Sequence, residues 1–165
     1  KRLSEEIGRN EVQLEKHAFN QTTHSIDTKL SSLLTVDRIL VLEESLGREE
    51  IWRMLLSRLQ VKNRKEALQL IHMREKTGST LIGPSVSIPH ARLEGINHLE
   101  VALAVSKKKE PRITVLFVSS TADTKDHLAF LGSLGRLFQN ETHVGQLCRL
   151  NSSAEILETI RRFES

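Results

Sequence analysis

Hydrophobic and polar residues follow two alternating periods along residues 33–163, which predicts strands and helices in alternation. Strands are expected where short apolar runs lack helical spacing, at residues 38–44, 86–88, 99–105 and 113–118. The last of these runs, ITVLFV, is β-branched and almost continuously apolar, as expected of a central strand covered on both faces. The pattern predicts an α/β fold with a mixed sheet, parallel and antiparallel, of about five strands flanked by helices on both faces.

Helices are predicted where apolar residues recur every three to four positions behind a polar residue that can cap the first turn. Asn63, with Glu66 three residues later, is typical of such a helix start. The helix that follows it places Arg74 in its last turn. Four helices are predicted in this way, at residues 48–59, 64–76, 123–138 and 152–163.

Residues 1–32 differ from the remainder of the chain because they are polar and only weakly periodic. A narrow helical stripe is formed by Leu3, Ile7, Leu14 and Ala18. Residues 21–29 lack any period and are typical of a linker. Since the sequence starts at Lys1 and not at methionine, we expect residues 1–32 to connect a domain at 33–165 to a missing upstream region.

Composition excludes several classes of protein. No run of about 20 apolar residues is present, and the amino-terminal residues lack the apolar segment of a signal peptide. Cys148 is the only cysteine, so an internal disulfide is excluded and a reducing compartment, most simply the cytoplasm, is expected. The net charge is only +3, and the basic clusters at 62–65 and 107–112 contain no aromatic residues, so no nucleic acid is expected as a partner.

Among the seven histidines, His90 has the most unusual setting, in the segment SIPHAR. It follows a predicted strand, at a position where α/β sheets often expose functional groups, and Pro89 restricts the backbone beside it. None of the histidines belongs to an HExxH motif, so no metal site is expected. The glycines of TGSTLIGPS lack the GK[ST] ending of a phosphate-binding loop, so no nucleotide is expected either.

Three further residues are candidates for a site around His90. Arg74 and Arg92 are forked donors suited to phosphoryl oxygens. His127, near the start of the helix after the central strand, is expected to reach the same end of the sheet, where a helix N-terminus favours an anion. From the residues alone, an ordinary surface or core role for either histidine stays open.

Two segments of the chain resemble the enzyme IIA domain of the bacterial phosphotransferase system. They read MREKTGSTLIGPSVSIPHAR and HLAFLGSLGRLF. The resemblance is to the type-2 group, the fructose, mannitol and nitrogen-regulatory enzymes IIA, and it covers about residues 33–163. It implies that His90 is the phosphorylated histidine and that Arg74 and His127 belong to its active site.

The resemblance implies a phosphoryl carrier in sugar transport or nitrogen regulation. His90 would accept the group from the histidine phosphocarrier protein and pass it to an enzyme IIB or a regulated target protein, without any cofactor. Arg74, Arg92 and His127 would stabilise the transition state. The chain departs from the family motif at Leu81, Pro84 and Ser85, so we expect the loop before His90 to have a different shape around the phosphate.

Two other functions stay open at this point. One is an enzyme IIA-like regulatory or docking module, fused to a transporter or a transcription regulator, in which phosphotransfer has diverged or been lost. The start at Lys1 favours such a fusion, and it would make the chain the cytosolic domain of a larger protein. The other is an unrelated ligand-binding α/β domain. The presence of His90, Arg74 and His127 favours an active phosphotransferase over both.

Overall fold

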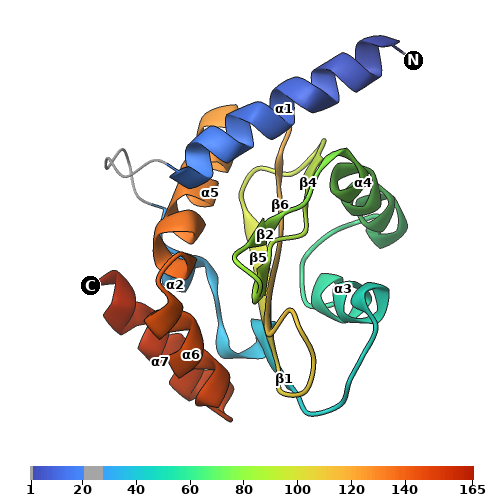
Figure 1. The fold of residues 1–165 in the computed structure, drawn as a ribbon. Coiled ribbons are helices and arrows are strands. Elements are labelled where there is room, and N and C mark those ends of the chain that lie inside the picture. The colour runs from blue at the N-terminus through green and yellow to red at the C-terminus, as the bar shows by residue number, and fades with distance from the viewer. Residues whose placement is uncertain (1, 21–27) are drawn as a thin grey trace.

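The computed structural model describes residues 2–20 and 28–165, and it consists of a central sheet with helices on both sides (Figure 1). The helices are α1 (Arg2–Asn20), α2 (Leu30–Leu33), the 3-10 turn η1 (Val36–Arg38), α3 (Arg48–Leu56), α4 (Arg64–Thr77), α5 (Thr124–Phe138), α6 (Glu141–Arg149) and α7 (Ser153–Glu164). The strands are β1 (Ile39–Leu42), β2 (Leu81–Ile82), β3 (Val86–Ser87), β4 (His90–Leu93), β5 (Glu100–Ser106) and β6 (Ile113–Ser120).

The sheet is mixed, as the sequence predicts, and its strand order is β1-β5-β6-β3-β2 with β4 also paired to β6. Strands β5 and β6 are antiparallel, whereas β1 runs parallel to β5, and both β3 and β4 run parallel to β6. Every residue of β6 from Ile113 to Ser119 is buried. The prediction of a central, doubly covered strand at 113–118 is therefore confirmed.

His90 begins a strand and does not end one, which corrects the sequence prediction for residues 86–88. Strand β3 ends at Ser87, and β4 begins at His90 along the same edge of β6. Pro89 lies between them and has no N–H for the ladder, which interrupts the regular pairing. Its carbonyl still accepts a hydrogen bond from the Phe117 N–H at 3.2 Å, so His90 is held in register opposite Phe117.

The sheet separates two hydrophobic cores, because successive side chains of β6 point to opposite faces. Val115 and Phe117 pack in the core under α2, α5, α6 and α7, while Leu116 and Val118 pack in the core under α3 and α4. Figure 1 shows these two layers of helices on opposite sides of the sheet. The predicted helices on both faces are therefore confirmed.

The helix starts that the sequence predicts are also present. Asn63 accepts a hydrogen bond from the Glu66 N–H at 3.0 Å, and Asp123 accepts one from the Asp126 N–H at 3.0 Å. Each bond satisfies an N–H group that has no partner within its own helix. The cap at Asp123 fixes the first turn of α5 and thus the position of His127.

Helix α1 lies across one end of the sheet and packs against α5 (Figure 1). Its buried side chains are Val12, Glu15 and Ala18, whereas Leu14 is 51% exposed. The predicted stripe is therefore wrong at Leu14, and its members Leu3 and Ile7 lie outside the described side chains. The helix buries a carboxylate in place of a leucine because Glu15 finds charged partners in the domain. Among the described residues, no helix is long and apolar enough to cross a membrane.

Candidate functional site

Three of the four predicted site residues meet around the carboxylate of Glu15. His90 Nε2 lies 2.9 Å from both carboxylate oxygens, and His127 Nε2 lies 3.0 Å from Oε1. Arg74 donates to Oε2 from Nε at 2.9 Å and from Nη2 at 2.8 Å. All four side chains are buried. We call Glu15, Arg74, His90 and His127 the Glu15 cluster.

The His90 ring is fixed in orientation, and its Nδ1 proton is held by a backbone carbonyl. It stacks on the Phe117 ring with centroids 4.9 Å apart and an angle of 9° between the planes. Its Nδ1 lies 2.7 Å from the Ile88 carbonyl oxygen, which can only accept a hydrogen bond. Nδ1 therefore has the proton and donates it to Ile88, and Nε2 is the nitrogen that faces the cluster.

His127 is held by the first turn of α5 and by β6. Its Nδ1 lies 2.7 Å from the Ser119 hydroxyl on β6. Burial lowers the pKa of His127, and the hydrogen bond to Glu15 only partly opposes that effect. The neutral ring fits this setting, because the Ser119 hydroxyl can donate to Nδ1 while the Nε2–H donates to Glu15.

Arg74 extends from the last turn of α4, and a backbone carbonyl holds the Nη1 side of its guanidinium. Nη1 donates to the Gly78 carbonyl at 2.9 Å, which leaves Nε and Nη2 directed at Glu15. A guanidinium held in this way presents two parallel donors to an oxyanion. The position of Arg74 in the last helical turn is confirmed.

Arg92 lies at the rim and makes no hydrogen bond within the Glu15 cluster. Its Nη2 donates to the Thr124 hydroxyl at 2.9 Å and to the Ser120 carbonyl at 3.2 Å. It lines a hollow of about 240 Å³ together with Glu11, Arg74 and His90. Arg92 therefore borders the approach to His90 from outside.

The electrostatics of the Glu15 cluster favour an anion. Burial alone would raise the pKa of Glu15, but hydrogen bonds from His127, His90 and Arg74 outweigh it and hold that pKa well below its usual range. Glu11, one turn earlier, behaves oppositely: burial, and then the negative charge of Glu15, raise its pKa. The site thus stabilises one negative charge between three donors.

Comparison with protein families identifies the fold. Residues 32–163 match the model of the family described as phosphoenolpyruvate-dependent sugar phosphotransferase system, EIIA 2. The chain belongs to this family. The match excludes an unrelated ligand-binding α/β domain, and it leaves α1, with Glu15, outside the residues that the family shares.

Solved structures of enzyme IIA domains share the fold. The nitrogen regulatory protein IIA-Ntr from Neisseria meningitidis is similar with a TM-score of 0.71 and 21% identity, over 79% of this chain and 98% of that one. IIA mannitol from Escherichia coli is similar with a TM-score of 0.61 and 19% identity, over 77% and 98%. The complex of enzyme IIA mannitol with phosphorylated enzyme IIB mannitol from Escherichia coli is similar with a TM-score of 0.60 and 18% identity, over 78% and 97%. No curated protein matches the chain.

Glu15, His90 and His127 also form a group that could hold a metal ion. One ligand atom from each lies within 4.8 Å of the other two. No sequence motif predicts this group, because the carboxylate comes from a residue 75 positions before His90. Arg74 contacts the same carboxylate, and its fixed positive charge disfavours a divalent cation there. The donor set of this enzyme IIA domain therefore suits an anion better than a metal.

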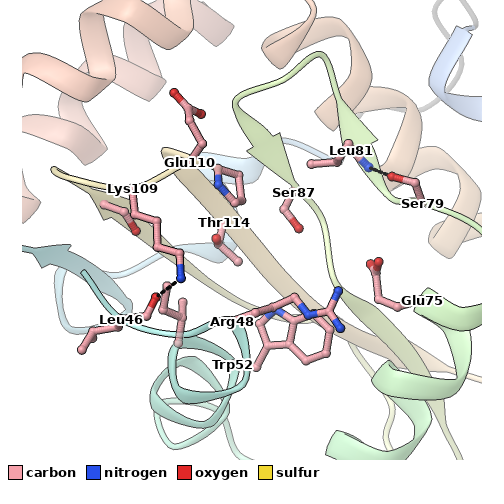
Figure 2. A pocket seen from close by; sticks show the side chains of 13 residues that line it. Leu46, Arg48, Trp52, Glu75, Ser79, Leu81, Ser87, Lys109, Glu110 and Thr114 are labelled. Atoms are coloured by element: carbon pink, nitrogen blue, oxygen red, sulfur yellow. Dashed lines mark hydrogen bonds between the residues drawn. The ribbon is translucent and has the colours of Figure 1, made fainter. Parts of the chain in front are cut away.

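The side chains at which the chain departs from the family motif line two hollows other than the one at His90. Leu81 is 53% exposed and lines a cavity of about 460 Å³ together with Trp52 and Ser87 (Figure 2). Pro84 and Ser85 line a different hollow, which residues of α5 and α6 complete. None of these three side chains borders the hollow at His90. Their substitution therefore changes the surface beside the other two hollows.

Glu15 is the site residue that the sequence did not predict. It stands in a polar helix among other charged residues, and a glutamate in that setting is ordinarily solvated. It also lies outside the residues that match the family. No local signal distinguishes it from Glu11, one turn earlier, and its role follows only from the packing of α1 on the domain.

Proposed function

We propose that this enzyme IIA domain accepts a phosphoryl group on Nε2 of His90. The observation that best supports the proposal is the convergence of His90, His127 and Arg74 on one carboxylate. A phosphoryl group presents oxygens of similar charge and hydrogen-bonding geometry to the same donors. The resemblance of the IPHAR segment to the family motif points to the same residue.

The proposed reaction transfers the group between two imidazoles. The P–N bond of the donor phosphohistidine breaks as a bond forms to His90 Nε2, and the electron pair of the broken bond returns to the donor ring nitrogen. The His90 Nδ1 proton stays on the hydrogen bond to Ile88, so Nε2 of the neutral ring has a free lone pair. Arg74 and His127 donate to the equatorial oxygens, where charge spreads in the loose transition state.

We further propose the histidine phosphocarrier protein as the donor and an enzyme IIB, or a regulated target protein, as the acceptor. A structure similar to this chain is a complex between an enzyme IIA and a phosphorylated enzyme IIB, which supports the second assignment. Arg92, at the rim of the hollow, is placed to contact an approaching partner. In this scheme residues 33–165 form the phosphoryl carrier and residues 1–32 an appendage to it.

The proposal is tested by intact-mass measurement after incubation with phosphoenolpyruvate, enzyme I and the phosphocarrier protein. We expect the wild-type chain to gain one acid-labile phosphate and His90→Ala to gain none. His98→Ala is the matched control, because His98 is a mostly exposed histidine that lies outside the Glu15 cluster. Labelling of folded His90→Ala, or no labelling of the folded wild-type chain, would contradict the proposal. The second result would favour a docking module that no longer transfers a phosphoryl group.

A further inference from the structure

Helix α1 places the Glu15 carboxylate where a phosphoryl group on His90 would be. His90 Nε2 lies 2.9 Å from each carboxylate oxygen, so a phosphorus atom bonded to Nε2 would need the same space. The carboxylate also takes up the donors of His127 and Arg74. Docked α1 and phosphorylated His90 therefore exclude each other.

The same contact removes the lone pair that His90 needs as a nucleophile. An ionised carboxylate only accepts hydrogen bonds, so the contact with Glu15 requires a proton on His90 Nε2. Nδ1 already donates its proton to the Ile88 carbonyl. With α1 docked, both ring nitrogens are donors, and a ring in that state cannot attack phosphorus.

The surface of α5 is shaped to receive α1. A Cβ atom built at Gly135 would lie 2.5 Å from the Phe19 carbonyl oxygen, and one built at Gly132 would lie 3.3 Å from the Ala18 carbonyl oxygen. The absence of side chains at these two positions lets the backbones approach closely. The Gln139 side-chain amide also donates to the Phe19 carbonyl at 2.9 Å. The helix that presents His127 thus also forms the seat of α1.

The docked helix depends strongly on one charge. Over its described side chains α1 buries Val12, Glu15 and Ala18, and Phe19 is partly buried against the core, so its apolar contacts are few and Glu15 is its one buried charge. A phosphoryl dianion on His90 would take over the donors of Glu15 and repel both Glu15 and Glu11, which faces the same hollow. A contact of this kind is reversible.

We propose that α1 is an internal competitor of the phosphoryl donor, with Glu15 as the occupant of the phosphoryl site, and that phosphorylation of His90 releases α1. The inference rests on the proposed function, since it needs a phosphoryl group at His90. It assigns to α1 the regulation of that site. The position of α1 then reports whether the domain is phosphorylated.

Three variants of the 165-residue chain test the competition. Glu15→Gln keeps the shape of the side chain and removes its charge, whereas Gly135→Ala disturbs the seat of α1 without replacing any residue of the Glu15 cluster. Gly145→Ala is the matched control, because a Cβ atom at this helical glycine of α6 meets nothing within 4 Å. We measure the initial rate of labelling by the phosphocarrier protein.

Glu15→Gln and Gly135→Ala should be labelled about tenfold faster than wild type, since a loss of about 1.4 kcal/mol in docking free energy raises the open population tenfold. Gly145→Ala should keep the wild-type rate. Equal rates in all four proteins would overturn the inference while leaving the proposed function standing.

Hydrogen exchange of the α1 backbone gives a second readout. We expect protection in the unphosphorylated wild-type chain, and loss of it in Glu15→Gln, in Gly135→Ala and in the phosphorylated wild type. Unchanged protection of β6 amides shows that Gly135→Ala still folds. Protected α1 in the phosphorylated chain would overturn the inference alone. If no variant is labelled at all, the proposed function fails, and with it the regulation assigned to α1, even where α1 is found docked.

Discussion

Among the residues whose burial the structure describes, two carboxylates are buried with similar partners, and one of them lies at the proposed active site. Glu15 binds one arginine and two histidines. Glu100, on β5, accepts hydrogen bonds from Arg38 Nη2, from His98 Nε2 and from the Gln60 backbone N–H, each at 2.8 Å. We call Glu100 and these three partners the Glu100 cluster. Both clusters pair a glutamate with an arginine and with at least one histidine.

The clusters differ in how their histidines are held. His90 and His127 are buried, and each has its second ring nitrogen fixed, by the Ile88 carbonyl and the Ser119 hydroxyl. His98 is 66% exposed. A reacting imidazole needs a defined tautomer and a fixed orientation, whereas a structural ion pair needs neither. The fixed imidazoles therefore support the proposal that the reaction takes place at the Glu15 cluster.

The clusters also differ in what their carboxylates connect. Glu100 ties η1 and the end of the α3 region to β5, all within the residues that match the family. Glu15 comes from α1, outside those residues, and all its partners lie inside them. One carboxylate is thus part of the domain, and the other can leave it. The following experiments separate these roles.

The largest difference is expected between the two arginines. In a Glu15→Gln background, which removes the competing carboxylate, Arg74→Ala should slow labelling about 100- to 1,000-fold, because a positioned donor to the transition state is lost. Arg38→Ala in the same background should leave the rate unchanged. The measurement is the initial labelling rate of each double variant, and equal rates for the two would remove the distinction between the clusters.

The two carboxylates should differ in their effect on stability. Glu100→Gln should lower the free energy of unfolding by about 2 kcal/mol, because the partly buried Arg38 charge is left without its partner. Glu15→Gln should cost about 1 kcal/mol or less, since undocking of α1 lets water reach Arg74 and the histidines.

Urea unfolding followed by the fluorescence of Trp52, the single tryptophan, measures both changes in stability. Trp52 is buried and lies in the core under α3 and α4, so its signal follows the domain and not α1. Labelling should rise only in Glu15→Gln. A loss of stability in Glu15→Gln equal to that in Glu100→Gln would make α1 an integral part of the fold.

The sequence predicts most of the fold because its signals there are local. The predicted cap at Asn63 depends on two residues three positions apart and is present in the structure, and the helices predicted from residues 123 and 152 are capped there by Asp123 and Ser152. The apolar run of β6 likewise defines a buried strand without reference to distant residues. The break between β3 and β4 was missed, because Pro89 can extend or interrupt a pairing and only the register with β6 decides which.

The site is predictable in part, and Glu15 shows where prediction stops. His90, Arg74 and His127 were assigned through the resemblance to a family motif, and the structure brings them together. Glu15 reaches them from positions 59 to 112 residues away, and no period or spacing encodes that contact. The hydrophobicity of Leu14 predicts that it is buried. The face of α1 that packs on the domain is instead determined by the three donors around Glu15 and by the glycines of α5.

Acid should release α1 before it unfolds the domain. The pKa of Glu15 is held below its ordinary value of 4.5, so its contribution to docking is fully present above pH 4.5 and is lost as the pH falls towards the docked-state pKa. The pKa of His127 lies below 6.5, so the docked helix also loses support as the pH falls below that value. Glu11, whose pKa is raised, acts in the opposite direction, favouring docking when protonated.

Arg74, His90 and Arg92 are the other charged or titratable groups around these carboxylates. Hydrogen exchange of α1 between pH 6 and pH 3 measures the effect, corrected for the intrinsic exchange rate at each pH. Wild type should lose protection mainly as the pH falls below 4.5, whereas Glu15→Gln should change little because its α1 is already released. Full protection of wild-type α1 at pH 3 would contradict the role given to the Glu15 charge.

The smallest effect is expected at His98. Its side chain is 66% exposed, so its bond to Glu100 competes with water, and His98→Ala should change the free energy of unfolding by about 0.5 kcal/mol or less. Its labelling rate should equal that of wild type. His127→Ala is the matched comparison, because His127 is buried and donates its hydrogen bond to the carboxylate of the other cluster, Glu15. A loss above about 1 kcal/mol in His98→Ala would mean that the Glu100 cluster depends on its histidine as closely as the Glu15 cluster does, and exposure would no longer separate the two.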